Sequence, residues 1–151
     1  TEPMETTMSP SQGHFNAFND VWLLDGLRTP LVDYCGALAD VSPTDLGIKV
    51  AREVLARSGI APAQVDSVLT GSMAPGDFDQ FFLPRHIGLY AGVPQHVPAL
   101  MVQRICGTGF ELFRQAGEQI AAGIARTSSA AWWPAITSAA ISPSLLALCA
   151  R

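Results

Sequence analysis

The sequence predicts an α/β fold, because short apolar segments with strand character alternate with segments whose apolar residues repeat at helical spacing. Two strand candidates, Val21–Leu24 and Val65–Gly71, flank a strongly helical segment that begins at Ser42. A strand, a helix and a second strand in this order predict a right-handed βαβ unit whose strands pair in parallel. The length of 151 residues suits one domain with one core.

The composition is apolar and slightly acidic. Hydrophobic residues make up 48% of the sequence, and charged residues make up 15%, against about 25% in an average soluble domain. The net charge of −4 lacks the basic surplus that nucleic-acid-binding domains carry. We therefore expect no nucleic-acid partner, and the low charge favours contact with a partner surface.

Residues 1–20 are polar and rich in turn-forming residues, so we expect a flexible N-terminal tail. No basic start with a following apolar run marks a secretory signal, and we expect a reducing compartment, the cytoplasm. The continuous apolar run Val21–Leu24 then predicts a strand buried on both faces. Asp25 and Gly26 end this run.

The helical segment after this strand has clear start and stop signals. Ser42 is an N-cap candidate, followed by Pro43 at the first helical position and by Asp45 three residues on. Gly59 supplies the stop. One apolar face is predicted, formed by Leu46, Val50, Val54 and the adjoining Leu55.

Two further elements and a second long helix are predicted downstream. Leu83–Ala91 reads as a short helix, and Val97–Ile105 reads as a third strand. A second helical pattern starts at Cys106, so the chain turns there from strand to helix. Its apolar residues recur at alternating spacings of three and four: Phe110, Phe113, Gly117, Ile120 and Ile124.

Cys106 is the candidate nucleophile. At a strand-to-helix turn, unsatisfied amides and the helix dipole favour a thiolate and can hold the oxyanion formed when a thioester is attacked. Gly107 and Gly109 are expected to relax the steric limits on this turn. The alternative, a small buried residue that packs under Phe110, is equally compatible with its position. For Cys35 and Cys149 structural roles are favoured, and no metal site is predicted from this odd set of thiols.

Several segments around these elements resemble one known family. The most specific is VPALMVQRICGTGF, residues 97–110, which is similar to the segment around the reactive cysteine of thiolases, the acetyl-CoA acetyltransferase family. Others that match in order and spacing, over Val21 to Arg126, are DGLRTP (25–30) with GAL (36–38), SPTDLG (42–47) and LPRHIGLYAGVP (83–94).

The resemblance implies the layered α/β thiolase fold, with this chain as the first part of its N-terminal repeat, a mixed or parallel sheet and a helix N-terminus that bears the nucleophile. It implies that Cys106 takes an acyl group from an acyl-CoA and passes it to an acetyl-CoA carbanion or to free CoA. Coenzyme A thioesters, as in fatty acid metabolism, are the expected substrates. No permanently bound cofactor is expected, and a full-length form is expected to be a homo-oligomer.

The family's other catalytic groups match no position here. They are a His in a Gly-His-Pro motif, an Asn-associated water and a second Cys. Neither that motif nor a late Cys-x-Gly follows Cys106, and His86 and His96 are assigned structural or surface roles. By resemblance Arg85 shapes a dimer contact or the catalytic loop, and the alternative is a solvated helix residue.

The likeness ends at Arg126, which divides the chain into a tail (1–20), a partial thiolase domain (21–126) and an atypical segment (127–151). We hypothesise that the reading frame shifts between Thr127 and Ala131; the alternative is a natural C-terminal extension. Prolines interrupt the apolar residues of this segment, so no membrane span is expected.

Three functions follow as hypotheses. The first is acyl transfer of the thiolase type through a thioester on Cys106. The second is a truncated, catalytically inactive fragment that acts at most as a binding or oligomerisation module. The third is a condensing enzyme of the ketoacyl synthase group, which the Ile105–Phe110 context disfavours.

Overall fold

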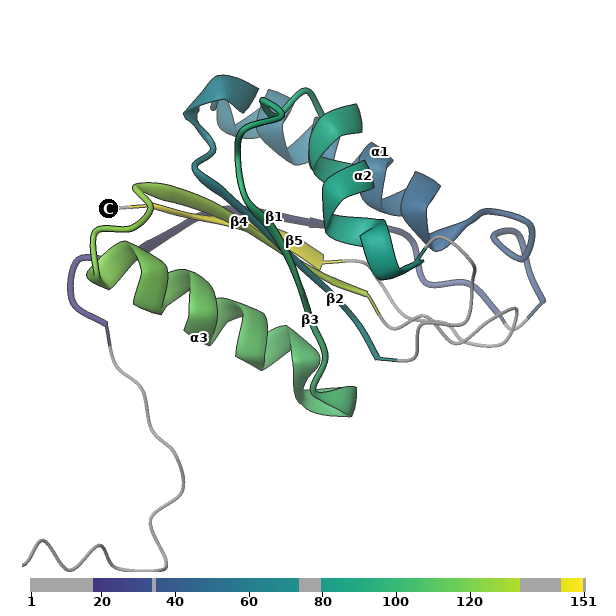
Figure 1. Ribbon diagram of the computed structural model, residues 1–151. Coiled ribbons are helices and arrows are strands. Elements are labelled where there is room, and N and C mark those ends of the chain that lie inside the picture. The colour runs from purple at the N-terminus through teal and green to yellow at the C-terminus, as the bar shows by residue number, and fades with distance from the viewer. Residues whose placement is uncertain (1–17, 34, 74–79, 134–144, 151) are drawn as a thin grey trace, which may run out of the picture.

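The computed structural model describes residues 18–33, 35–73, 80–133 and 145–150 (Figure 1). Within them, five strands form one sheet in the order β1-β5-β4-β2-β3. Parallel pairing joins β2 to β3 and to β4, and antiparallel pairing joins β5 to β4 and to β1. The strands are β1 (Trp22–Arg28), β2 (Ser67–Ser72), β3 (Ala99–Val102), β4 (Thr127–Trp133) and β5 (Leu145–Ala150).

The α/β class and the mixed sheet are confirmed, but the predicted pairing of the first two strands is wrong. β1 lies at the edge of the sheet and pairs with β5 alone, so β1 and β2 are not neighbours. Its apolar run is also not buried on both faces, since Trp22, Leu23 and Leu24 are all exposed. A short apolar run has strand character wherever it lies, and it does not specify its partner or its place in the sheet.

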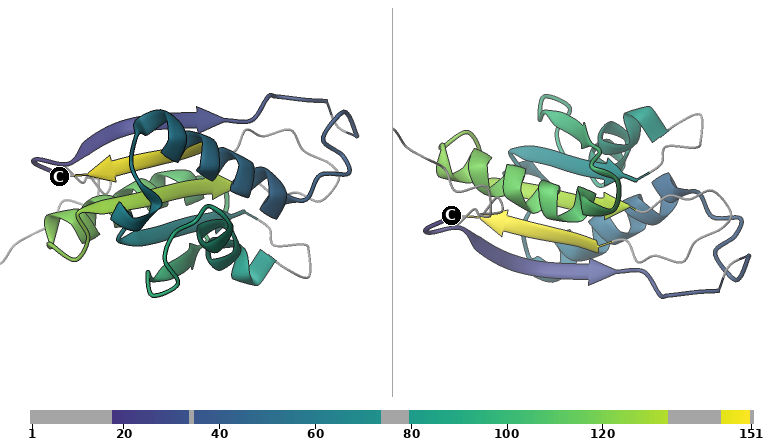
Figure 2. Two further views of the ribbon diagram at one scale, coloured as in Figure 1. Left: turned by 90° about the horizontal axis from the view of Figure 1, so that it is seen from above. Right: turned by 90° about the horizontal axis from the view of Figure 1, so that it is seen from below.

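The sheet separates two layers of helices. Helices α1 (Pro43–Ser58) and α2 (Leu83–Tyr90) cover one face, and α3 (Thr108–Ala121) covers the other (Figures 1 and 2). Three short 3₁₀ turns complete the described elements: η1 (Pro62–Gln64), η2 (Gln80–Phe82) and η3 (Ile105–Gly107). Among the described residues no helix is both long and apolar enough to cross a membrane.

Helix α1 begins and ends where its sequence signals predict. The hydroxyl of Ser42 accepts a hydrogen bond from the amide of Asp45 at 3.0 Å, which satisfies one of the first-turn donors. Gly59 follows the helix in the left-handed conformation, with φ 70°. These two caps fix the bounds of the helix.

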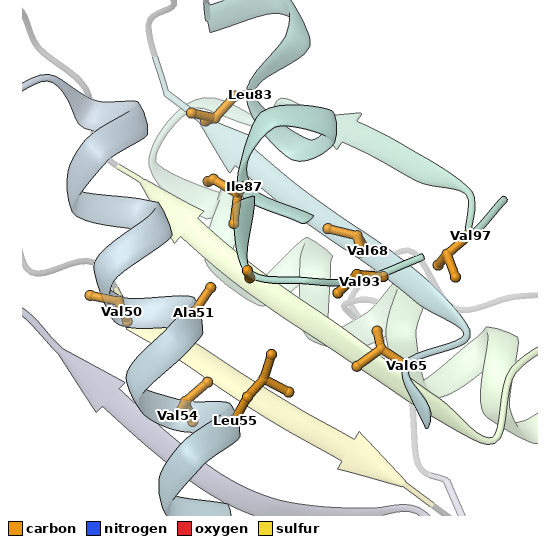
Figure 3. Packing of buried hydrophobic residues seen from close by; sticks show 11 residues of the cluster. Val50, Ala51, Val54, Leu55, Val65, Val68, Leu83, Ile87, Val93 and Val97 are labelled. Atoms are coloured by element: carbon orange, nitrogen blue, oxygen red, sulfur yellow. The ribbon is translucent and has the colours of Figure 1, made fainter. Parts of the chain in front are cut away.

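Each face of β2 contributes to a separate core, because successive strand residues point to opposite faces. Val68 of β2 packs against the layer formed by α1 and α2, in a cluster shown in Figure 3. Leu69 packs on the other side, against the buried face of α3. The α3 core consists of Leu69, Val102, Leu112, Ala116 and Ile120.

The predicted apolar face of the second long helix is partly wrong. Ile120 and Gly117 are buried, but Phe110 is 83% exposed and Ile124 lies beyond the end of α3 at 73% exposure. The core instead contains Leu112 and Ala116, which lie eight and four residues before Ile120. The predicted set with Phe110 and Phe113 and the buried set with Leu112 and Ala116 both repeat at helical spacing. The sequence pattern favoured the first set because its aromatic side chains are larger.

Candidate active site around Cys106

Cys106 lies between the end of β3 and the start of α3, in the 3₁₀ turn η3. Its thiol is free and its side chain is exposed. This exposure contradicts the alternative in which Cys106 packs under Phe110 as a small core residue. The strand-to-helix turn expected at this position is confirmed, and helix α3 begins two residues after the cysteine.

The strain of the turn falls on Ile105 and not on a glycine. Ile105 has φ 47°, a left-handed conformation that is unusual for a β-branched residue and costs on the order of 1–3 kcal/mol. Gly107 has an ordinary φ of −88°, and a Cβ there would meet only Arg104 at 3.8 Å. The predicted supporting glycines, Gly107 and Gly109, therefore lie in the turn and in the first turn of α3, and at Gly107 a side chain would meet no close obstacle.

Thr108 holds the strained turn closed. Its side-chain oxygen accepts a hydrogen bond from the amide of Arg104 at 2.8 Å and donates one to the carbonyl of Ile105 at 2.7 Å. The amide of Gly107 donates to the carbonyl of Arg104 at 2.9 Å. These three bonds surround the backbone that presents Cys106, and Thr108 itself is fully buried.

Gly71 of β2 allows Thr108 to sit this close to the sheet. A Cβ at Gly71 would lie 2.2 Å from the Cγ2 methyl of Thr108 and 2.7 Å from the carbonyl oxygen of Val102. Neither approach is possible for real atoms. Because Gly71 has no side chain, β2 can pack closely against both β3 and the N-terminus of α3.

Met73 follows β2 and contacts the candidate nucleophile. The Sγ of Cys106 lies 3.9 Å from the Sδ of Met73. The side-chain amide of Gln103 donates to the carbonyl of Met73 at 2.8 Å, which ties the end of β2 to the segment after β3. Neither Met73 nor Gln103 stood out in the sequence, because their relation to Cys106 depends on the parallel pairing of β2 with β3.

An ion-pair network spans the same turn. Glu111, in the first turn of α3, accepts a hydrogen bond from Arg104 at 2.9 Å, and it also pairs with Arg114. Gln115 donates to the same carboxylate at 3.0 Å, and Arg114 further pairs with Glu118. The Arg114 hydrogen bond, followed by those of Gln115 and Arg104, lowers the pKa of Glu111 from 4.5 to about 2.

We expect Glu111→Gln to remove part of the acid sensitivity of the fold. The folded-state pKa of Glu111 lies below its unfolded value, so the ionised carboxylate stabilises the fold above about pH 4.5 and loses this effect as the pH falls towards 2. Because Arg104 is largely exposed, salt screening reduces the contribution to about 1–3 kcal/mol.

Urea unfolding of both proteins from neutral pH down to pH 2 measures this effect. The difference in free energy of unfolding between wild type and Glu111→Gln should shrink as the pH falls through that window. A difference that stays constant with pH would contradict the assignment. Asp45→Asn is a control at an acidic residue in the first turn of another helix, α1.

The other residues singled out in the sequence lie away from Cys106. Arg85 of α2 donates to the carbonyls of Gln95 and Val97, both at 3.0 Å, so it ties α2 to the segment before β3. This contact corrects its interpretation as a merely solvated helix residue. His86 stacks on Tyr90 with ring centroids 6.5 Å apart. His96 is exposed, in the segment before β3.

The comparisons with known proteins agree on one family. The sequence model of the thiolase N-terminal domain matches residues 21–130. Mitochondrial 3-ketoacyl-CoA thiolase of Bos taurus is 38% identical over 91 residues, which are 60% of this chain and 23% of that protein. An acetyl-CoA acetyltransferase of Allochromatium vinosum is 33% identical over 104 residues, which are 69% of this chain and 26% of that protein.

Solved structures show the same likeness. Human mitochondrial 3-ketoacyl-CoA thiolase in complex with CoA matches with a TM-score of 0.71 at 33% identity, over 74% of this chain and 28% of that one. An acetyl-CoA acetyltransferase from Syntrophomonas wolfei matches with a TM-score of 0.70 at 29% identity, over 76% and 29%. The chain thus spans about a quarter of the length of the curated relatives that it matches.

Proposed function

The chain belongs to the thiolase family, and from this membership we propose that it takes part in acyl transfer from coenzyme A thioesters, with Cys106 as the acyl acceptor. The observation that carries the proposal is the exposed free thiol of Cys106 at the strained turn before α3. A solved relative is described in complex with CoA, which supports a CoA thioester as the substrate.

In the proposed step, the thiolate of Cys106 attacks the carbonyl carbon of an acyl-CoA. A bond forms between Sγ and that carbon, the carbon–sulfur bond to CoA breaks, and CoA leaves as its thiolate. Among the described residues no side chain caps the N-terminus of α3, but the amides of Gly107 and Thr108 already donate to the carbonyls of Arg104 and Ile105. We therefore propose that the backbone amide of Cys106 itself faces the developing oxyanion.

The return step releases the acyl group to a second CoA thiolate or to the carbanion of an acetyl-CoA. The family's proton-transfer groups match no motif in this sequence, so this step needs groups beyond those assigned here. We therefore propose acylation of Cys106 as the half-reaction that the chain itself carries.

Incubation of the purified chain with acetyl-CoA tests this function. Intact mass should rise by one acetyl group, and peptide mapping should place that group on Cys106. Cys106→Ser should abolish the adduct, while Cys35→Ser should leave it, because Cys35 is an exposed cysteine outside the turn. An unmodified Cys106 that still reacts with iodoacetamide, or equal acetylation of Cys35, would reject the proposal.

A second candidate function is association without catalysis. Large apolar side chains are exposed on both helix α3 and the edge strand β1, including Phe110 at 83% and Trp22 at 66%. A surface of this kind favours contact with another protein surface, and we propose a second copy of the chain. Light scattering measures this state, and association without an acetyl adduct on Cys106 supports the binding module over the enzyme.

The compartment is also a proposal. The exposed thiol of Cys106 is free, which suits a reducing compartment such as the cytoplasm. Several of the relatives are mitochondrial by name. Fractionation of cells that express the tagged full-length protein distinguishes the two.

A further inference from the structure

Met73 is the apolar side chain that contacts the sulfur of Cys106. The two sulfur atoms lie 3.9 Å apart, which is van der Waals contact, and the Met73 side chain is half-buried beside an exposed cysteine. Gln103 fixes the backbone of Met73 through its hydrogen bond to the carbonyl. The end of β2 is thereby held against the nucleophile by a residue that follows β3.

This contact places Met73 in the path of a bound acyl group. An acyl group on Cys106 begins with a carbonyl carbon bonded to Sγ, and its chain continues from there. A chain that extends towards β2 meets the Met73 thioether within its first few atoms, because no gap separates the two sulfur atoms. A two-carbon acyl group ends before this contact matters, whereas a longer chain must displace the Met73 side chain.

Among the described residues, Met73 is an apolar side chain in direct contact with the thiol of Cys106. The flanking residue Arg104 is charged and pairs with Glu111, so the ion pair offers no surface for a hydrocarbon chain. Methionine is unbranched and flexible, which lets it fill the space beside the thiol when no long acyl group is present. The size of the residue at this position therefore controls the space available to the acyl chain.

We propose that Met73 is a specificity-determining residue that restricts Cys106 to short acyl groups, acetyl in preference to medium-length chains. This inference rests on the proposed acylation of Cys106 and adds the class of acyl group. Discrimination of about tenfold is the size that a few methylene groups in a close apolar contact produce.

Acylation rates of Cys106 with acetyl-CoA and with hexanoyl-CoA test the inference. Wild type should acylate faster with acetyl-CoA. Met73→Ala should shift the ratio of the two rates by about tenfold towards hexanoyl-CoA, because it opens the path. Met73→Val should give an intermediate ratio. Met73→Leu, which conserves volume without the sulfur, should restore the wild-type preference and separate size from sulfur chemistry.

Alkylation of Cys35 by iodoacetamide in the same samples controls for general thiol reactivity, and circular dichroism confirms the fold of each variant. Acylation with the same rate ratio in wild type, Met73→Ala and Met73→Val overturns the inference while leaving the proposed function in place. A shifted ratio in Met73→Leu as large as in Met73→Ala also overturns it. Absence of acylation by either thioester in every variant overturns the proposed function and this inference together.

Discussion

Gly71→Ala is expected to destabilise the fold by at least about 3 kcal/mol, a loss comparable with much of the net stability of a small domain. The new Cβ would lie 2.2 Å from Thr108 and 2.7 Å from the carbonyl oxygen of Val102. One obstacle is a buried side chain and the other is strand backbone, so neither yields cheaply. The melting temperature should fall by roughly 6–12 °C for a chain of this size.

Two other glycines give matched controls for this substitution. Gly107→Ala places a Cβ 3.8 Å from Arg104, an ordinary contact, and its stability loss should stay below about 1 kcal/mol. Gly88→Ala in α2 meets Val68 at 3.2 Å, and the strain there is offset by a gain of about 1 kcal/mol in helix propensity. Thermal unfolding of the three variants should rank Gly71→Ala far below both controls. Equal melting temperatures would contradict the close packing of β2 on α3.

Leu112→Ala is expected to cost about 2–5 kcal/mol of unfolding free energy. Leu112 is 1% exposed and belongs to the core between α3 and the sheet, together with Leu69 and Ile120. Truncation to alanine removes apolar contacts from both the strand and the helix. The cavity then lies next to the turn that carries Cys106, so acylation of Cys106 should slow as well.

Phe110→Ala is the control for this truncation. Phe110 lies in the same helix and loses more atoms than Leu112, but its side chain is 83% exposed. Its removal should change the free energy of unfolding by no more than about 0.5 kcal/mol. Urea denaturation measures both variants. A larger loss for Phe110→Ala than for Leu112→Ala would mean that α3 packs through its other face.

The parts of the fold that depend on local chemistry could be predicted from the sequence. Ser42 and Gly59 bound α1 through hydrogen bonds and backbone conformation that involve only nearby residues. The strand that precedes Cys106 and the helix that follows it were also predicted, though β3 is shorter than the expected Val97–Ile105. The strand ends at Val102, and the left-handed φ of Ile105 begins the turn three residues later.

The parts that depend on distant pairing could not be predicted. The apolar sequence of β1 is typical of a buried strand. Its position at the edge of the sheet follows only from its pairing with β5. In the segment 127–151, Thr127–Trp133 forms the strand β4 between β2 and β5, while the division of the chain at Arg126 stays a prediction. Residues 134–144 of that segment lie outside the described residues.

The candidate site divides in the same way. Cys106 stood out because its neighbours along the chain mark a strand-to-helix turn and resemble one family. Met73 and Gly71 reach that turn from β2, through the register that sets Gly71 opposite Val102. A sequence pattern contains no register between separate strands, so these contacts required the structure. The ion pairs of Arg114 with Glu111 and Glu118 could have been suggested by the sequence, because three and four residues separate the partners along the helix.

The pairing of β1 with β5 has a consequence for synthesis on the ribosome. β1 is made first among the strands, yet its partner in the sheet is made last, and Trp22 pairs with Ala150. Contacts between such distant segments form slowly, because a long loop must close before they stabilise the chain. During translation β1 therefore emerges with unpaired backbone N–H and C=O groups along its length, and they stay without a strand partner until β5 is made.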